Sequence, residues 1–376
     1  ALALLACREV GPFESMHRPP PGDPPWRLTF NPGDDRAPAW SPAGDSVYYS
    51  ADGFDDLPPI RDLLLRVPRA GGTAELLLAD VQTAVTSDRR LPSVAPSPDG
   101  GRIAYAQLWN VYEDEGTEGC RLGWVCSSSD TVGSIPPLGS VMCRVRAAQG
   151  GGSIEDDPAL RIDFAGWSIV DNGQVPPLEL LESHPFQVLY ALEGARIFRP
   201  TWAPDGERVA LSDGLRLLVW RVGEAQAVPI PGTEDGVGPG WSPDGAWIAY
   251  TYLERGASRT FTCVCPTAFG VSRRQERTVY EVVSRRVRLV RPDGSEQIDL
   301  AEGEDPAWTP DGSAIVFSAG NRLWRIGRDG SGLVEIPGTV GGREPAVSPD
   351  GRYLTFARGN AIGMHDVWVV SLDSGQ

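Results

Sequence analysis

The fold of this chain is decided by the stretch Trp241–Tyr250, which reads WSPDGAWIAY. Pro243 presets φ for the second position of a tight turn, Asp244 can accept hydrogen bonds from nearby amides, and Gly245 can adopt a positive φ. Ile248 and Tyr250 then alternate with period two, as a strand with one buried face requires. The stretch therefore predicts a strand, a tight turn and a second strand.

Six approximate copies of this turn occur along the chain. They are Ser41-Pro42-Ala43-Gly44, Ser97-Pro98-Asp99-Gly100, Ala203-Pro204-Asp205-Gly206, Ser242-Pro243-Asp244-Gly245, Thr309-Pro310-Asp311-Gly312 and Ser348-Pro349-Asp350-Gly351. A tryptophan precedes four of them, at positions 40, 202, 241 and 308. A second turn, such as Arg291-Pro292-Asp293-Gly294, follows in most units. Two hairpins per unit predict four-stranded antiparallel sheets, and stacking these sheets in a ring predicts an all-β β-propeller.

The spacing of the turns predicts the number of blades. Between the turn prolines, the interval is 39 residues from Pro204 to Pro243 and again from Pro310 to Pro349. The interval from Pro98 to Pro204 holds either one blade with a long insertion or two blades. Because residues 186–192 resemble a strand inside it, a seventh blade stays open. We predict six blades.

The two ends of the repeat region are complementary. The last unit lacks its outermost strand, whereas an unassigned strand, Trp26–Phe30, precedes the first unit. We expect this N-terminal strand to complete the last blade and close the ring, which removes an open sheet edge.

The composition argues against two classes of function. The net charge of −16 argues against nucleic-acid binding. All 34 basic residues are arginine, so no lysine is available for Schiff-base chemistry. The turn aspartates are explained as turn formers, and we identify no catalytic residues, so whether the chain is an enzyme stays uncertain.

The N-terminal residues suggest export. Residues 1–7 are apolar and end in Leu4-Leu5-Ala6-Cys7, which resembles a bacterial lipobox. That resemblance implies that Cys7 is lipidated and that the protein is attached to the membrane through this lipid alone. The residue after Cys7 is not aspartate, which by the same resemblance favours the outer membrane, facing the periplasm or the surface. Residues 8–25 are proline-rich and predict an extended tether, leaving residues 26–376 as one propeller.

In an oxidising compartment the other cysteines could form disulfides. Four of them lie in two predicted insertions, at about 108–141 and 253–281: Cys120, Cys126, Cys263 and Cys265. A local Cys120–Cys126 bridge is one option, and Cys143 makes the count odd. The spacing does not fit a zinc site. We expect no metal and no cofactor, with structural Ca²⁺ as a minor alternative.

Trp241–Tyr250 closely resembles the WD40-like repeat of TolB-type propellers, and the resemblance extends over about residues 26–375. It implies the propeller fold and is unspecific for function. The chain departs from the family pattern because only a short segment precedes Trp26, where TolB carries an additional N-terminal domain. It also lacks a Gly-x-Ser-x-Gly nucleophile elbow and the histidine-rich metal site of oligogalacturonate lyases.

Two functions follow. The first is a non-catalytic envelope lipoprotein, expected to be a monomer, that binds a protein, peptide or glycan through its channel mouth and insertions. Its candidate binding residues are Trp109, Tyr112, Trp124, Arg273, Arg274 and Arg277. The second is a hydrolase or lyase acting on sugars or peptides in the channel, which would need carboxylates that converge at one end of the ring.

Overall fold

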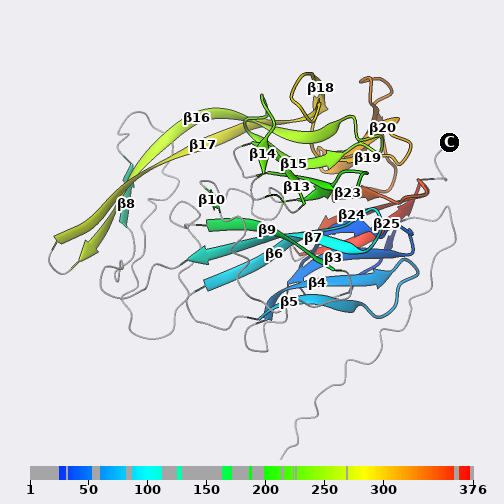
Figure 1. Cartoon of the computed structure of the whole chain (residues 1–376), viewed down its shortest axis with the longest axis horizontal. Helices are drawn as coiled ribbons and strands as arrows, with labels where there is room; N and C mark the ends of the chain where they lie inside the picture. The colour runs from blue at the N-terminus through cyan, green and yellow to red at the C-terminus, as the bar shows by residue number, and fades with distance from the viewer. Residues whose placement is uncertain are drawn as a thin grey trace, which may run out of the picture.

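The structure is a computed structural model that describes residues 25–30, 33–52, 60–81, 87–111, 125–128, 163–171, 186–188, 199–212, 216–222, 224, 227–267, 270–359 and 364–372. Within these ranges the regular structure consists of β-strands (Figure 1). No helix among them is long and apolar enough to cross a membrane. The predicted lipidation site Cys7 and residues 8–24 of the predicted tether lie outside the described residues.

The strands form six antiparallel sheets. The first three, in hydrogen-bonded order, are β2 (Asp35–Trp40), β3 (Ser46–Asp52), β4 (Ile60–Pro68) and β5 (Glu75–Val81); β6 (Ser87–Pro96), β7 (Arg102–Val111), β9 (Asp163–Asp171) and β10 (Phe186–Val188); and β11 (Thr201–Trp202), β12 (Arg208–Ser212), β13 (Leu217–Arg221) and β14 (Val228–Pro229). β10 is thus the outer strand of the second sheet, not the start of a sheet of its own.

The remaining three sheets follow the same order. They are β15 (Gly236–Trp241), β16 (Ile248–Thr267), β17 (Gly270–Val290) and β18 (Gln297–Glu302), with β8 (Val125–Ser128) added on β16; β19 (Glu304–Trp308), β20 (Ala314–Ala319), β21 (Arg322–Gly327) and β22 (Val334–Glu335); and β23 (Gly342–Val347), β24 (Tyr353–Gly359), β25 (His365–Ser371) and β1 (Trp26–Arg27).

The first strands of the six sheets surround one axis. β2 contacts β6, β6 contacts β11, β11 contacts β15, β15 contacts β19, β19 contacts β23, and β23 contacts β2. This circular order makes the molecule an all-β β-propeller, as the repeat predicts.

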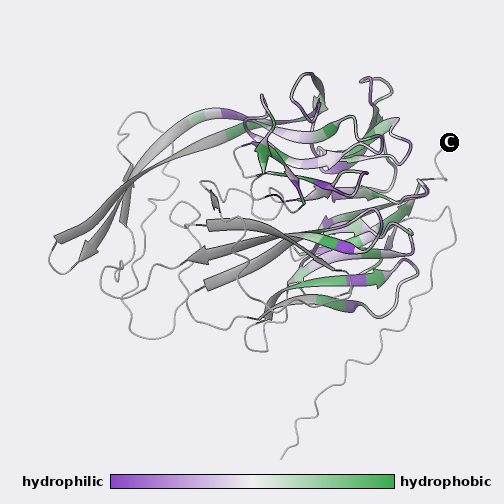
Figure 2. Cartoon of the chain, viewed as in Figure 1, coloured by the Kyte–Doolittle hydropathy of each residue, from purple (hydrophilic) through white to green (hydrophobic). Residues whose placement is uncertain are grey.

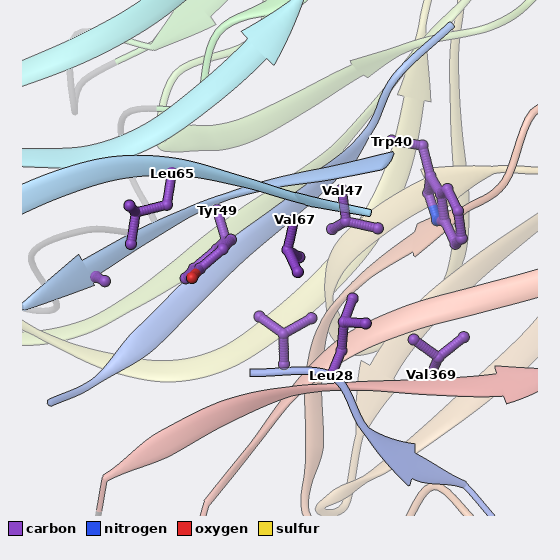
Figure 3. Close-up of a cluster of buried hydrophobic side chains, with 9 residues drawn as sticks. Leu28, Trp40, Val47, Tyr49, Leu65, Val67 and Val369 are labelled. Atoms are coloured by element: carbon purple, nitrogen blue, oxygen red, sulfur yellow. The ribbon is translucent and has the colours of Figure 1, made fainter. Parts of the chain in front are cut away.

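A hydrophobic cluster fills each junction between successive sheets. Figure 3 shows the junction of the first and last sheets, where Trp40, Val47 and Tyr49 face Leu28 and Val369. Similar clusters at the other junctions include Tyr48 with Ile103, Ala104 with Trp202, Ala203 with Trp241, Leu289 with Trp308, and Val316 with Phe356. Figure 2 shows hydrophobic positions along the strands and hydrophilic ones at many turns. Burial between sheets is therefore what holds the ring.

The N-terminal segment pairs with β25, and only Trp26–Arg27 of the predicted strand 26–30 forms strand β1. Trp26 pairs with Val369 and Arg27 with Trp368. The pairing continues as hydrogen bonds beyond β1, where Leu28 N donates to Val367 O at 2.7 Å and Val367 N donates to Thr29 Oγ1 at 2.9 Å. The first and last parts of the chain thus share one sheet.

The turns also stack around the ring. A Cβ added to Gly245 (φ +68°) would lie 3.1 Å from Pro204 Cγ of the preceding turn. In four other turns the glycine likewise lies beside the proline of the preceding turn: Gly44 beside Pro349, Gly100 beside Pro42, Gly312 beside Pro243, and Gly351 beside Pro310. Between the second and third turns, Arg102 instead donates through Nη2 to Gly206 O at 2.5 Å. The positive φ of these glycines suits the turn, and at Gly245 the neighbouring proline also leaves little room for a side chain.

Candidate binding surface at one end of the ring

The order of strands within each sheet gives the ring two different ends. In each sheet a proline-containing turn joins the first strand to the second. We call the end of the ring where these turns lie the turn end; their prolines are Pro42, Pro98, Pro204, Pro243, Pro310 and Pro349. The second and third strands are joined at the opposite end, because neighbouring strands are antiparallel. Both predicted insertions fall between the start of the second strand and the end of the third strand of their sheets, one beginning within β7 and the other lying within β16 and β17. We call this opposite end the insertion end.

At the insertion end the longest strands continue past the sheet that contains them. β16 and β17 remain paired from Ile248 with Val290 out to Thr267 with Gly270. We call residues 255–267 and 270–282 the arm. Figure 1 shows it extending well beyond the neighbouring sheets, with β8 beside its outer part. The sequence predicted an insertion at 253–281, and the structure gives it as a two-stranded ribbon instead of an irregular loop.

Polar contacts surround the base of the arm. Arg255 forms an ion pair with Asp235, and Arg285 forms one with Glu304 of the next sheet at 3.1 Å. Arg288 lies over the Tyr252 ring, with 3.6 Å between Cζ and the ring centroid. The Asp299 carboxylate accepts from both Arg286 and Arg288, which lowers the pKa of that carboxyl. The arm is thus attached to two sheets before it leaves the ring.

The first strands carry a recurring backbone bulge near the insertion end. Ala37, Asp305 and Glu344 have φ of 49°, 56° and 52°, and a proline follows each of them. Gly238, with φ 58°, precedes Pro239 in the same way. Non-glycine residues at positive φ are strained by about 1–2 kcal/mol, so other contacts must hold these bulges.

Hydrogen bonds between successive sheets hold them. Ala37 N donates to Glu344 Oε2 at 2.7 Å, Glu344 N donates to Asp305 Oδ2 at 3.4 Å, and Asp305 N donates to Thr251 Oγ1 at 3.0 Å. Asp305 and Glu344 are 5% and 3% exposed. Their carboxylates therefore join neighbouring sheets. These hydrogen bonds explain why Asp305 and Glu344 are buried on the first strands.

A second polar group ties the last sheet to the first at the insertion end. Asp34, which is buried, accepts from His365 N at 2.6 Å, contacts His365 Nδ1 at 2.9 Å, and pairs with Arg36. Next to it, Arg27 Nη2 lies 2.6 Å from Asp366 Oδ1. These contacts join chain segments more than 300 residues apart.

The turn aspartates lie at the other end and are bonded as turn formers. Asp311 Oδ1 accepts from Thr309 Oγ1 at 2.6 Å and from Ser313 N at 3.1 Å, which lowers its pKa to about 2. Asp99, Asp244 and Asp350 accept from the hydroxyl two residues before them and the amide two residues after them. In the first turn, where Ala43 replaces the aspartate, Asp45 accepts from Ser41 Oγ at 2.7 Å.

The structure brings together some of the predicted binding residues. Arg273, Arg274 and Arg277 lie on the arm in β17, paired with Cys265, Val264 and Phe261 of β16.

Among the other predicted binding residues, the structure describes Trp109 alone. Trp109 lies within β7, paired with Arg89 and Phe164, so it is a sheet position and not part of a loop. The insertion therefore begins after Val111, and not at 108. Tyr112, Trp124 and Cys120 fall outside the described residues.

The bulge carboxylates were missed by the sequence reasoning, although a signal existed. A proline stands two residues before Trp40, Trp241, Trp308 and Val347, and the residue before that proline forms the bulge. Among the described residues, no group of three or more His, Cys, Asp or Glu side chains could hold a metal ion.

No family model matches this sequence, and no curated protein matches it. TolB from Acinetobacter baumannii matches with a TM-score of 0.44 and 13% identity over 85% of this chain and 58% of its own. A putative TolB from Agrobacterium tumefaciens matches with a TM-score of 0.43 and 16% identity over 92% of each chain. An oligogalacturonate lyase in complex with manganese matches with a TM-score of 0.46 and 14% identity over 92% of this chain and 79% of its own. The match thus spans less than two thirds of the first TolB.

Proposed function

We propose that this chain is a non-catalytic binding propeller whose insertion end, and above all the arm, holds an acidic partner. The partner class is a protein, a peptide or a glycan. The observation that carries the proposal is the arm, a paired ribbon that leaves the ring at the insertion end. Packing within the ring does not need a ribbon of this length.

Charge supports an acidic partner. The arm has five arginines and two glutamates in a chain whose net charge is −16: Arg255, Arg259, Arg273, Arg274, Arg277, Glu276 and Glu281. A basic segment on an acidic molecule directs an anionic surface to one place, because the rest of the molecule repels it.

The bonding of the buried acids supports binding over catalysis. The Asp305 and Glu344 carboxylates accept backbone N–H groups of successive sheets. A hydrolase or lyase would need carboxylates directed at a substrate. The alternative of a channel enzyme therefore has less support than the binding function.

We further propose a six-bladed ring whose last blade is completed by β1. The six sheets and the clusters between them support this count, including the junction of Ala104 with Trp202 between the second and third sheets. Trp202 Nε1 also donates to Ala95 O at 3.0 Å across that junction, where a seventh blade would have to lie.

For the cell, we propose an envelope lipoprotein anchored at Cys7, in the outer membrane. The basis is the sequence of residues 1–7. Expression with a complete leader and radiolabelled palmitate tests it. We expect the natural protein to incorporate the radiolabel and to be recovered in the membrane fraction. Cys7→Ala should show neither result. Equal membrane fractionation of both would contradict the anchor.

The binding proposal is tested with an arm-deleted variant. Residues 256–281 are replaced by Asn-Gly, which joins Arg255 to Val282, a register pair, through a two-residue turn. In pull-downs from envelope extract followed by mass spectrometry, we expect a specific partner with the intact chain and its loss with the deletion.

Charge variants refine that experiment. Reversal of Arg273, Arg274 and Arg277 to glutamate should weaken binding at least tenfold. The matched control reverses Arg221, Arg328 and Arg352, which are exposed and far from the arm in the turn-end loops and strand ends. Equal binding by both triple variants would reject the arm as the binding surface.

A further inference from the structure

A pair of cysteines from distant parts of the sequence meets on the arm. β8 and β16 are antiparallel, and their register pairs Cys126 with Cys263. The flanking pairs, Val125 with Val264 and Ser127 with Thr262, run in the same register. The pairing therefore belongs to a four-residue ladder and not to an isolated approach.

This register satisfies the backbone requirement of a disulfide. Directly opposed residues of an antiparallel pair have Cα atoms about 4.5 Å or about 5.5 Å apart, depending on the pair type. Disulfides are formed at Cα separations of about 4.4–6.8 Å. Either pair type therefore allows the bond.

Among the described cysteines, the alternative pairings, which involve Cys265, are less well placed. Cys265 is paired with Arg273 on β17 and lies one position past the end of the ladder with β8, whose last pair is Val264 with Val125. Cys263 and Cys265 are two positions apart on one strand, where an extended backbone separates their Cα atoms by about 6.6 Å, at the upper limit for a disulfide.

We propose that Cys126 and Cys263 form a disulfide that fastens the insertion after β7 to the arm. The oxidant is a thiol–disulfide exchange partner. One cysteine thiolate attacks its disulfide, a mixed disulfide forms, and the second thiolate displaces the remaining thiol. Two protein thiols lose two protons and two electrons, and one disulfide of the oxidant becomes two thiols.

The bond has a structural purpose. β8 has only four residues, lies at the edge of the arm, and comes from a segment more than 130 positions away from its partner strand. A two-stranded ribbon is marginally stable in water, and a third strand supports it. A covalent link keeps the third strand in place. The inference does not depend on the proposed binding function.

Peptide mapping tests it directly. The full chain is treated with oxidised glutathione, alkylated without reduction and digested with trypsin. Cys126 lies in peptide 122–144, Cys263 in 260–273 and Cys120 in 103–121. We expect 122–144 linked to 260–273, and loss of that species on reduction. A link between 103–121 and 122–144 as the main product, or free thiols in both 122–144 and 260–273, would overturn the proposal.

Serine variants locate the bond within the peptides, because 122–144 also contains Cys143 and 260–273 also contains Cys265. Cys126→Ser and Cys263→Ser should each abolish the linked species. Cys143→Ser and Cys265→Ser are the matched controls and should retain it. Loss in a control with retention in Cys126→Ser or Cys263→Ser would assign the bond elsewhere and contradict the register. Circular dichroism of each variant confirms that it is folded.

Discussion

At the scale of single residues, the tryptophan before the turn joins neighbouring sheets. Trp40 Nε1 donates to Ala346 O at 3.0 Å, and Trp308 Nε1 donates to Gly240 O at 2.9 Å. Each acceptor belongs to the first strand of the preceding sheet. Trp241 Nε1 is buried and has no hydrogen-bond partner among the described residues. The repeat thus places the same residue in two energetic situations.

This difference predicts unequal effects of one substitution. Trp40→Phe loses a hydrogen bond and should cost about 1 kcal/mol more than Trp241→Phe, in addition to any difference in packing. Both side chains are equally buried, at 7% exposed, so they are a matched pair. Chemical denaturation of the two variants measures this difference in the free energy of unfolding. Equal losses would show that the indole hydrogen bond contributes nothing.

The turn aspartates make stability depend on acidity. Because the pKa of Asp311 is lowered to about 2 from 3.8, its contribution is complete above about pH 4 and is lost as the pH falls toward 2. The group is exposed, so the contribution is small, about 2 °C in Tm or less. Asp311→Asn should lower Tm at pH 7 and have a much smaller effect at pH 2, as followed by calorimetry. A constant difference at both values would contradict this account.

At the scale of elements, the arm adds length to a sheet whose described buried side chains lie outside the arm. Buried side chains of β16 and β17, such as Tyr250 and Leu289, lie before the arm begins and after it ends. The alternation of strand residues made the inner part of both strands predictable. The ribbon itself was not predicted, because its polar and apolar residues do not define one buried face.

Deleting the arm should therefore leave the ring folded. For the Asn-Gly replacement of residues 256–281 we expect Tm to change by less than about 3 °C, with far-ultraviolet circular dichroism retained in proportion to length. A loss of cooperative unfolding would show that the arm takes part in the core.

At the scale of the whole molecule, a short N-terminal segment pairs with the last sheet and packs between it and the first sheet. Leu28 is 4% exposed and packs in the cluster of the first and last sheets. Trp26 and Tyr353 meet edge to face, with 6.1 Å between ring centroids. The segment therefore contributes to a junction between sheets and also completes a sheet edge.

Removing residues 26–30 should destabilise the entire ring. Loss of the Leu28 side chain alone is worth about 2–5 kcal/mol, and the strand pairing adds to it. In urea, we expect a lower midpoint of the single transition for a chain that begins at Pro32. A chain that begins at Asp23 is the control and should match the full protein. Equal midpoints for the two truncations would contradict closure by this segment.

The sequence by itself determined the repeat, the propeller and the strand that completes the last sheet. These follow from local rules, since Pro, Asp and Gly fix a turn and period-two alternation fixes a buried face. Only the tertiary structure showed that Glu344 and Asp305 join successive sheets, that Trp109 belongs to a strand, and that Cys126 lies opposite Cys263. Such contacts link residues far apart in the chain, and their partners are set by how sheets meet around the ring. No local pattern encodes that meeting.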